Sequence, residues 1–138
     1  MYLVYFYAIL MLGSCIAQIS FTGPAHLVVT NINTGEVHEE TSILIIYTGG
    51  SPNDMIIKRG ETIEIKFIPP ESYKDHKFNV NIVFLDKDVN IDNHPYSIRV
   101  TIDDNVPIGS YPIYCSAMCH DWSDESSCEQ SMGVRIVN

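Results

Sequence analysis

Three side chains late in this 138-residue sequence could together hold a soft metal ion. Cys115 offers a thiolate, His120 an imidazole and Met132 a thioether. A type 1 copper site needs one thiolate and two imidazoles in a rough plane, with a weak axial thioether. Three of the four ligand types for one copper ion therefore lie close together in the chain.

The same stretch predicts a strand, a loop and a second strand. The run 111–114 indicates a strand that ends at Cys115, and 134–137 indicates a closing strand that opens at Met132. His120 falls in the loop between them. A hairpin of this kind would bring the three side chains together, and a second imidazole would have to come from a strand earlier in the chain.

Alternation of apolar and polar residues predicts β-structure along the rest of the chain. Ile63, Ile65 and Phe67 point one way and their polar neighbours the other. Similar strand-like runs occupy residues 26–33, 43–47, 78–84 and 96–102. No window shows sustained helical periodicity. We expect an all-β fold, a single antiparallel Greek-key β-sandwich of seven or eight short strands.

The N-terminal segment predicts export from the cell. Residues 2–12 are apolar and uncharged, and small residues follow up to Ala17. We therefore expect a signal peptide over residues 1–17, one domain over residues 18–138 and a secreted product with no membrane attachment after cleavage. The Leu12–Cys15 stretch also leaves open a lipoprotein signal, although a basic residue before the apolar run is lacking in both cases.

The charge of the chain limits its partners. There are 17 acidic and 8 basic residues, a formal net charge of −9. An acidic surface repels phosphate, so nucleic acid is excluded as a partner. The same charge favours solubility and could steer the protein toward a basic partner.

Three cysteines remain after removal of the signal peptide, namely Cys115, Cys119 and Cys128. In an oxidising compartment one pair is expected to close, which leaves one thiol over. Count and spacing alone do not fix the connectivity.

His76 stands at the start of the predicted strand 78–84, and several motif pieces accompany it. They are Gly60-Glu61-Thr62-Ile63, His76-Lys77-Phe78, Gly109-Ser110-Tyr111, Tyr114-Cys115, His120 and Met132 through Val137. Together they resemble the cupredoxins, the blue copper protein family, over about residues 52 to 138. The resemblance implies one type 1-like copper ion held by His76, Cys115, His120 and Met132.

The sequence departs from this family by a longer insertion between His120 and Met132. We expect a disulfide between Cys119 and Cys128 to close off the insertion as a surface loop, which leaves Cys115 as the thiolate. The implied protein is a monomeric one-electron or copper carrier with a redox or recognition partner protein, and not an enzyme.

Other interpretations stay open beside this one. His94 could replace His76, Met118 could replace Met132, and the Cys115–Cys119 spacing matches a binuclear CuA-like site that would lack its following histidine. The segments 55–61 and 105–111 also resemble the Ig-like N-terminal domain of transglutaminases. That likeness implies a metal-free secreted recognition module on the same scaffold. A lipid-binding sandwich is a third interpretation, although the early cysteines usual for it are absent.

Overall fold

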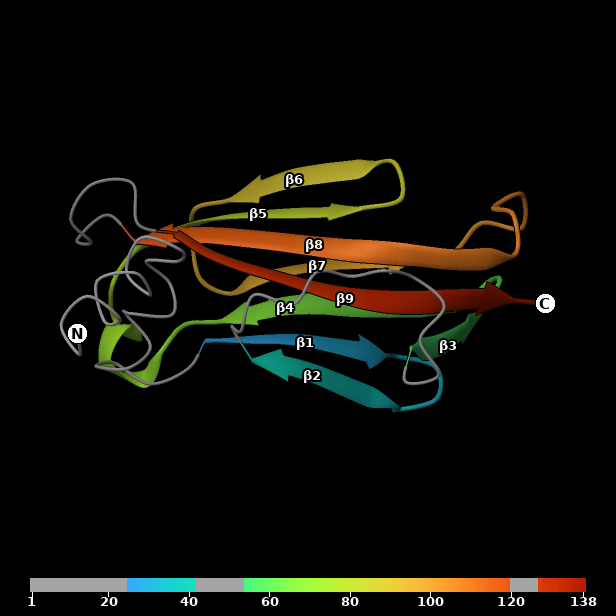
Figure 1. Ribbon diagram of the computed structural model, residues 1–138, viewed down its shortest axis with the longest axis horizontal. Helices are drawn as coiled ribbons and strands as arrows, with labels where there is room; N and C mark the ends of the chain where they lie inside the picture. Colours follow the sequence, from blue (N-terminus) through green and yellow to red (C-terminus); the bar gives the residue numbers. More distant parts are fainter. Residues whose placement is uncertain (1–24, 42–53, 120–126) are drawn as a thin grey trace, which may run out of the picture.

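The computed structural model of the protein describes residues 25–41, 54–119 and 127–138. In this part of the chain two β-sheets lie face to face as a β-sandwich (Figure 1). The predicted all-β fold is confirmed, with nine strands among the described residues. None of these residues forms a helix that is long and apolar enough to cross a membrane.

Sheet A has four strands in the order β2-β1-β4-β7, and all neighbours are antiparallel. Its strands are β1 (His26–Asn31), β2 (Val37–Thr41), β4 (Thr62–Ile68) and β7 (Tyr96–Thr101). Sheet B has five strands in the order β3-β9-β8-β5-β6, of which only β3 and β9 pair in parallel. Its strands are β3 (Met55–Lys58), β5 (Phe78–Phe84), β6 (Lys87–Ile91), β8 (Gly109–Cys119) and β9 (Ser127–Val137), and a 3-10 turn, η1 (Glu71–Tyr73), separates β4 from β5.

The core lies between the sheets and follows the predicted alternation. The apolar positions of β4 and β5 are buried and alternate with more exposed polar positions. Phe67 of β4, Phe78 of β5 and Tyr96 of β7 form an aromatic cluster, with ring centroids 5.6 to 6.2 Å apart. The Phe78 backbone N–H donates to the Tyr96 hydroxyl at 3.0 Å. This cluster joins the two sheets through both apolar contact and a buried hydrogen bond.

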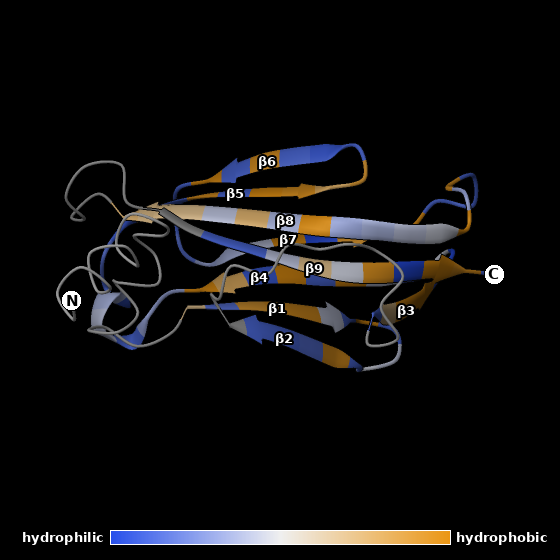
Figure 2. Ribbon diagram, viewed as in Figure 1, coloured by the Kyte–Doolittle hydropathy of each residue, from blue (hydrophilic) through white to orange (hydrophobic). Residues whose placement is uncertain are grey.

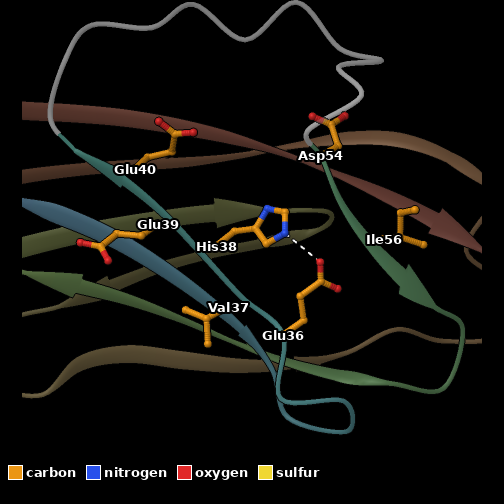
Figure 3. A pocket seen from close by; sticks show the side chains of 7 residues that line it. All are labelled: Glu36, Val37, His38, Glu39, Glu40, Asp54 and Ile56. Atoms are coloured by element: carbon orange, nitrogen blue, oxygen red, sulfur yellow. Dashed lines mark hydrogen bonds and ion pairs between the residues drawn. The ribbon is translucent and has the colours of Figure 1, made fainter.

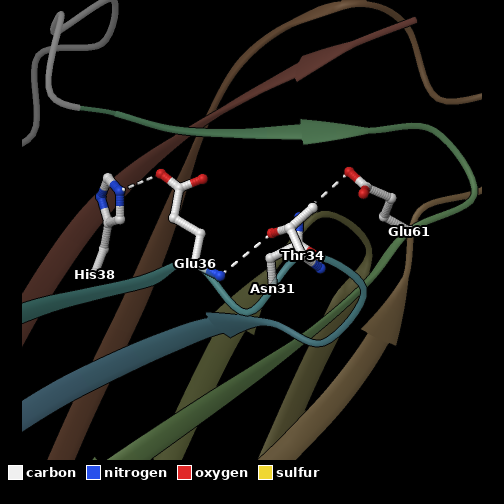
Figure 4. A network of polar contacts seen from close by, with 5 residues as sticks. All are labelled: Asn31, Thr34, Glu36, His38 and Glu61. Atoms are coloured by element: carbon white, nitrogen blue, oxygen red, sulfur yellow. Dashed lines mark hydrogen bonds and ion pairs between the residues drawn. The ribbon is translucent and has the colours of Figure 1, made fainter.

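A polar network holds the C-terminal end of β1 in place. Asn31 is fully buried, and its Oδ1 accepts hydrogen bonds from the backbone N–H groups of Asn33 and Thr34 at 3.0 and 3.3 Å. Its Nδ2 donates to Glu61 Oε1 at 3.2 Å (Figure 4). The same carboxylate oxygen accepts from the Lys58 N–H at 2.7 Å. Asn31 therefore ties the β1–β2 turn to the β3–β4 turn.

The β8–β9 hairpin is longer than the sequence pattern indicates. The strand expected to end at Cys115 continues to Cys119, and the strand expected to open at Met132 begins at Ser127. The inward alternation simply continues, because Ala117 and Cys119 are also buried. The predicted signal peptide and the run 43–47 lie outside the described residues.

Candidate functional site

Cys115 lies in the interior of β8 rather than at a strand end. In the register of sheet B it stands opposite Ile82 of β5 and Gln130 of β9. Only 3% of its surface is exposed, and among the described residues it has no disulfide partner. Burial raises the pKa of the Cys115 thiol from 9.0 to about 12, so the thiol is neutral at physiological pH. Such a thiol behaves as a small apolar core residue.

His76 lies at the end of the sandwich and not beside Cys115. It precedes β5 and stacks on Tyr73 of the 3-10 turn, with ring centroids 4.8 Å apart. Cys115 stands opposite Ile82, and β5 begins four residues earlier at Phe78, two residues after His76. At about 3.3 Å per residue the strand alone puts roughly 13 Å between Ile82 and Phe78, more than the roughly 4 Å between ligands of one metal ion.

Met132 does lie near Cys115. On β9, Met132 stands opposite Ile113 of β8 and two residues after Gln130, which faces Cys115. Its side chain is 5% exposed. The two sulfur side chains are therefore diagonal neighbours in the core. The polar side chain between them is Gln130, whose Nε2 donates to the carbonyls of Ala25 at 3.1 Å and Glu40 at 3.4 Å. Gln130 thereby links sheet B to sheet A, while its Oε1 has no partner among the described residues.

The register also bears on the expected bridge between Cys119 and Cys128. Cys128 stands opposite Ala117, so its backbone is diagonal to that of Cys119. Diagonal positions on neighbouring strands lie about 7–8 Å apart, just beyond the roughly 4.4–6.8 Å that a disulfide usually spans. The bridge stays a prediction, which counting the thiols of the unfolded protein would test.

The described residues bring together only part of the predicted copper centre. His76 lies at the end of β5, His120 lies outside the described residues, and Met132 is the one predicted ligand near the thiol. Within the described ranges no group of three or more His, Cys, Asp or Glu side chains could hold a metal ion. The four-residue centre expected from the sequence stays a prediction, because His120 lies outside the described residues.

The buried thiol gives a prediction for alkaline pH. In the unfolded chain Cys115 loses its proton near pH 9, whereas in the folded protein it keeps the proton to about pH 12. Between pH 9 and about pH 12 the folded state therefore binds more protons than the unfolded state, and the free energy of unfolding falls as the pH rises through this window. Because the folded pKa is raised by desolvation of the thiolate, unfolding releases the proton above pH 9 and becomes more favourable by about 1.4 kcal/mol per pH unit. Urea denaturation of wild type and Cys115→Ala at pH 8, 9 and 10 should show the wild type losing more stability than the variant, and parallel pH profiles would contradict this assignment.

The outer face of sheet B presents to solvent the side chains that do not pack into the core. On β8 the outward residues alternate with the buried ones, and Tyr114 and Met118 are 50% and 47% exposed. We call the sheet B face the set of outward positions at the centre of this sheet, namely Asn79, Asn81, Val83, Pro112, Tyr114, Ser116, Met118, Ser131 and Gly133. None of these residues carries a charge, and the charged outward positions beside them include Glu129, opposite Ser116, and Asp88, opposite Val83.

The outer face of sheet A has a different character. Glu64 and Arg99 stand opposite each other on β4 and β7 with 3.7 Å between the charged atoms, and Lys66 and Glu39 lie on the same face. In Figure 2, β8 at the centre of sheet B is coloured pale to orange, whereas the edge strands of the two sheets, β2 of sheet A and β6 of sheet B, are mostly blue. Sheet A thus has the mixed charge of a solvated surface, and the sheet B face does not.

An acidic groove runs between β2 and β3. Its lining residues are Glu36, Val37, His38, Glu39, Glu40, Asp54 and Ile56 (Figure 3). His38 Nε2 lies 2.8 Å from Glu36 Oε1, so the imidazole is held by its own strand. The groove contributes to the negative charge of the molecule, and its side chains assemble no recognisable reaction centre.

Comparisons with protein-family models, with curated proteins and with solved structures found no match. The candidate site therefore rests on the geometry of this chain. The sequence interpretation used Tyr114 as part of the motif at Cys115 and left Met118 open as an alternative to Met132, and it identified neither as a surface residue. The signal that could have found them is the alternation from Ile113 to Cys119, which continues past Cys115.

Proposed function

We propose that this protein is a secreted, metal-free β-sandwich module that recognises another protein through the sheet B face. The observation that carries the proposal is the uncharged set of side chains around half-exposed Tyr114 and Met118, in a chain of net charge −9. Interface cores are depleted of charged residues and enriched in Tyr, Trp, Phe, Met and Arg. The role is binding, without a catalytic step.

The chemistry of the face suits recognition of a protein surface. Tyr114 offers a large ring with few rotatable bonds, so its immobilisation costs little conformational entropy. Ser116 and Ser131 lie next to it, and their hydroxyl groups can donate or accept hydrogen bonds, whereas the Asn81 amide already donates to Asp88 Oδ1 at 2.7 Å. The backbone beneath is a hydrogen-bonded sheet, so little backbone order has to be gained on binding.

Contacts at the far end of the sandwich agree with the Ig-like interpretation. The Tyr111 hydroxyl donates to the Pro107 carbonyl at 2.6 Å, just before the main part of β8. Ig-type sandwiches use such a tyrosine corner at the corresponding strand. Arg59 Nε donates to the Val106 carbonyl at 2.8 Å, so the two segments that resemble the transglutaminase Ig-like domain contact each other.

A copper titration separates this proposal from the copper carrier. Adding Cu(II) to the purified mature protein should produce no intense thiolate-to-copper charge-transfer band, because Cys115 is buried in the interior of β8 and faces Ile82 of β5, away from the strand end that His76 precedes. Cys115→Ser should leave the visible spectrum unchanged. A strong blue band that Cys115→Ser abolishes would contradict the proposal and restore the copper interpretation.

Site-specific photo-cross-linking tests recognition itself. A photo-reactive amino acid replaces Tyr114 on the sheet B face or, as the matched control, Arg99 on the outer face of sheet A, and the protein is irradiated in the medium of the cells that secrete it. We expect covalent adducts from position 114 and none from position 99. No adduct of any size from position 114 would overturn the proposal.

A further inference from the structure

The strand β2 forms one edge of sheet A. Among the described residues β2 pairs only with β1, so its other side faces no strand. The Asn31 N–H donates to the carbonyl of Glu36, the residue before β2, at 2.8 Å. Because the backbone groups of successive strand residues point to opposite sides, those of Val37 and Glu39 point away from β1. The N–H and C=O groups of these two residues are therefore directed to the place where a further strand would lie.

The side chains next to this edge are mostly acidic. His38 and Glu40 stand opposite buried residues of β1, so they lie on the face of β2 that is turned toward sheet B. The groove between β2 and β3 opens beside them, and Glu36 and Asp54 also line it (Figure 3). Among the described residues that line the groove, none is a lysine or an arginine. A strand added at this edge would therefore place alternate side chains in an acidic environment.

These charges determine which strand can pair with the edge. Like charges that stand opposite each other on neighbouring strands are destabilising, and opposite charges are stabilising. A second copy of β2 would bring acidic side chains together, in a chain whose net charge is already −9. A strand with lysine or arginine at every second position would instead place its basic groups beside Glu36 and Glu40. The edge thus excludes a copy of itself and favours a basic strand.

We propose that the β2 edge binds an extended basic segment of a partner protein, which adds to sheet A as an antiparallel strand with Lys or Arg at every second position. Strand addition of this kind gains affinity from main-chain hydrogen bonds and specificity from alternate side chains. The other positions of the segment lie on the outer face of sheet A beside Val37, whose side chain is 55% exposed. The β2 edge is separate from the sheet B face, so this proposal does not depend on the proposed function.

Fluorescence anisotropy with the purified mature protein and a labelled peptide of about eight residues, in which lysine alternates with valine, tests the proposal. We expect binding that weakens as salt is added, because salt screens the attraction between the charges. The same peptide with glutamate in place of lysine should not bind. Methylation of the valine backbone nitrogens, which would face Val37 and Glu39, should raise the Kd at least about tenfold, because it removes the main-chain donors.

Two matched pairs of variants locate the binding edge. Val37→Pro removes an N–H that points away from β1, where proline is tolerated in an edge strand, and should raise the Kd at least about tenfold. Val37→Ala keeps this N–H and should leave the Kd within about twofold of wild type. Glu40→Gln on the groove side should raise the Kd about two- to fivefold. Glu39→Gln removes the same charge from the outer face and should change the Kd by less than about twofold.

Circular dichroism establishes that each variant is folded, and the methylated peptide tests the main-chain contact on the wild type without any substitution. No binding of the lysine peptide at up to about 1 mM protein overturns the proposal. Equal affinity for the lysine and glutamate peptides also overturns it. So does binding that neither Val37→Pro nor methylation of the peptide weakens, because the peptide would then lie elsewhere on the acidic surface.

Discussion

Replacing Phe67 with alanine should lower the free energy of unfolding by about 3–5 kcal/mol, the range typical of a buried phenylalanine truncated in a core. Phe67 is 1% exposed, and its ring contacts those of Phe78 and Tyr96 at centroid distances of 5.6 and 6.2 Å. Truncation removes the apolar contact between β4 and β5 and leaves a cavity between two sheets whose hydrogen-bonded strands cannot collapse into it. The loss would be a large fraction of the about 5–15 kcal/mol that stabilises a typical domain.

Ile68→Ala provides the matched control for this substitution. Ile68 is the next residue of β4, and its side chain is 39% exposed. Its truncation should therefore cost about 1 kcal/mol or less. Urea denaturation followed by circular dichroism measures both values. If the two variants lie within about 1 kcal/mol of each other, the aromatic cluster does not hold the sheets together as argued.

The half-buried strands were predictable because their alternation is strong. In β4, Ile63, Ile65 and Phe67 are separated by polar residues, so a local pattern of period two suffices to identify the strand and its inner face. The edge strands β2 and β6 were not predicted. Their sequences, Val37–Thr41 and Lys87–Ile91, are mostly polar. They form strands because the backbones of β1 and β5 supply their hydrogen-bond partners.

The candidate site shows where local patterns stop being informative. The types and spacing of Cys115 and His120 carry no information on which residue of β5 will face Cys115. That pairing is a register between strands distant in sequence, and it places Ile82 there instead of a residue near His76. The alternation that continues from Ile113 to Cys119 was visible in the sequence and already implied a buried thiol and an exposed Tyr114.

The same register connects core and function. Each inward residue of β8 that packs the interior determines that its neighbours point outward, so a buried Cys115 and a half-exposed Tyr114 follow from one alternation. A one-residue shift of β8 would exchange the two sets. Rigid core packing on one side of sheet B therefore holds the proposed recognition surface on the other side in place.

Asn31→Asp should destabilise the protein by about 3 kcal/mol at neutral pH, the scale of an uncompensated buried charge, although the two side chains have nearly the same shape. The Oδ1 of either residue can accept from the Asn33 and Thr34 N–H groups. The native Nδ2, however, donates to Glu61 Oε1 at 3.2 Å, and the substitution places a second carboxylate oxygen there at a fully buried position. An unpaired buried charge next to a like charge is costly.

The deficit of Asn31→Asp should depend on pH and on Glu61. In acid one proton shared by the two carboxyl groups restores a hydrogen bond, so the variant should approach wild type near about pH 3 and fall behind as the pH rises toward about 7. In a Glu61→Gln background the glutamine amide can donate to the introduced carboxylate, so the same substitution should cost about 1 kcal/mol or less. Urea denaturation of the four proteins gives the coupling free energy directly. Equal costs of Asn31→Asp in both backgrounds would show that this buried contact does not join the two turns.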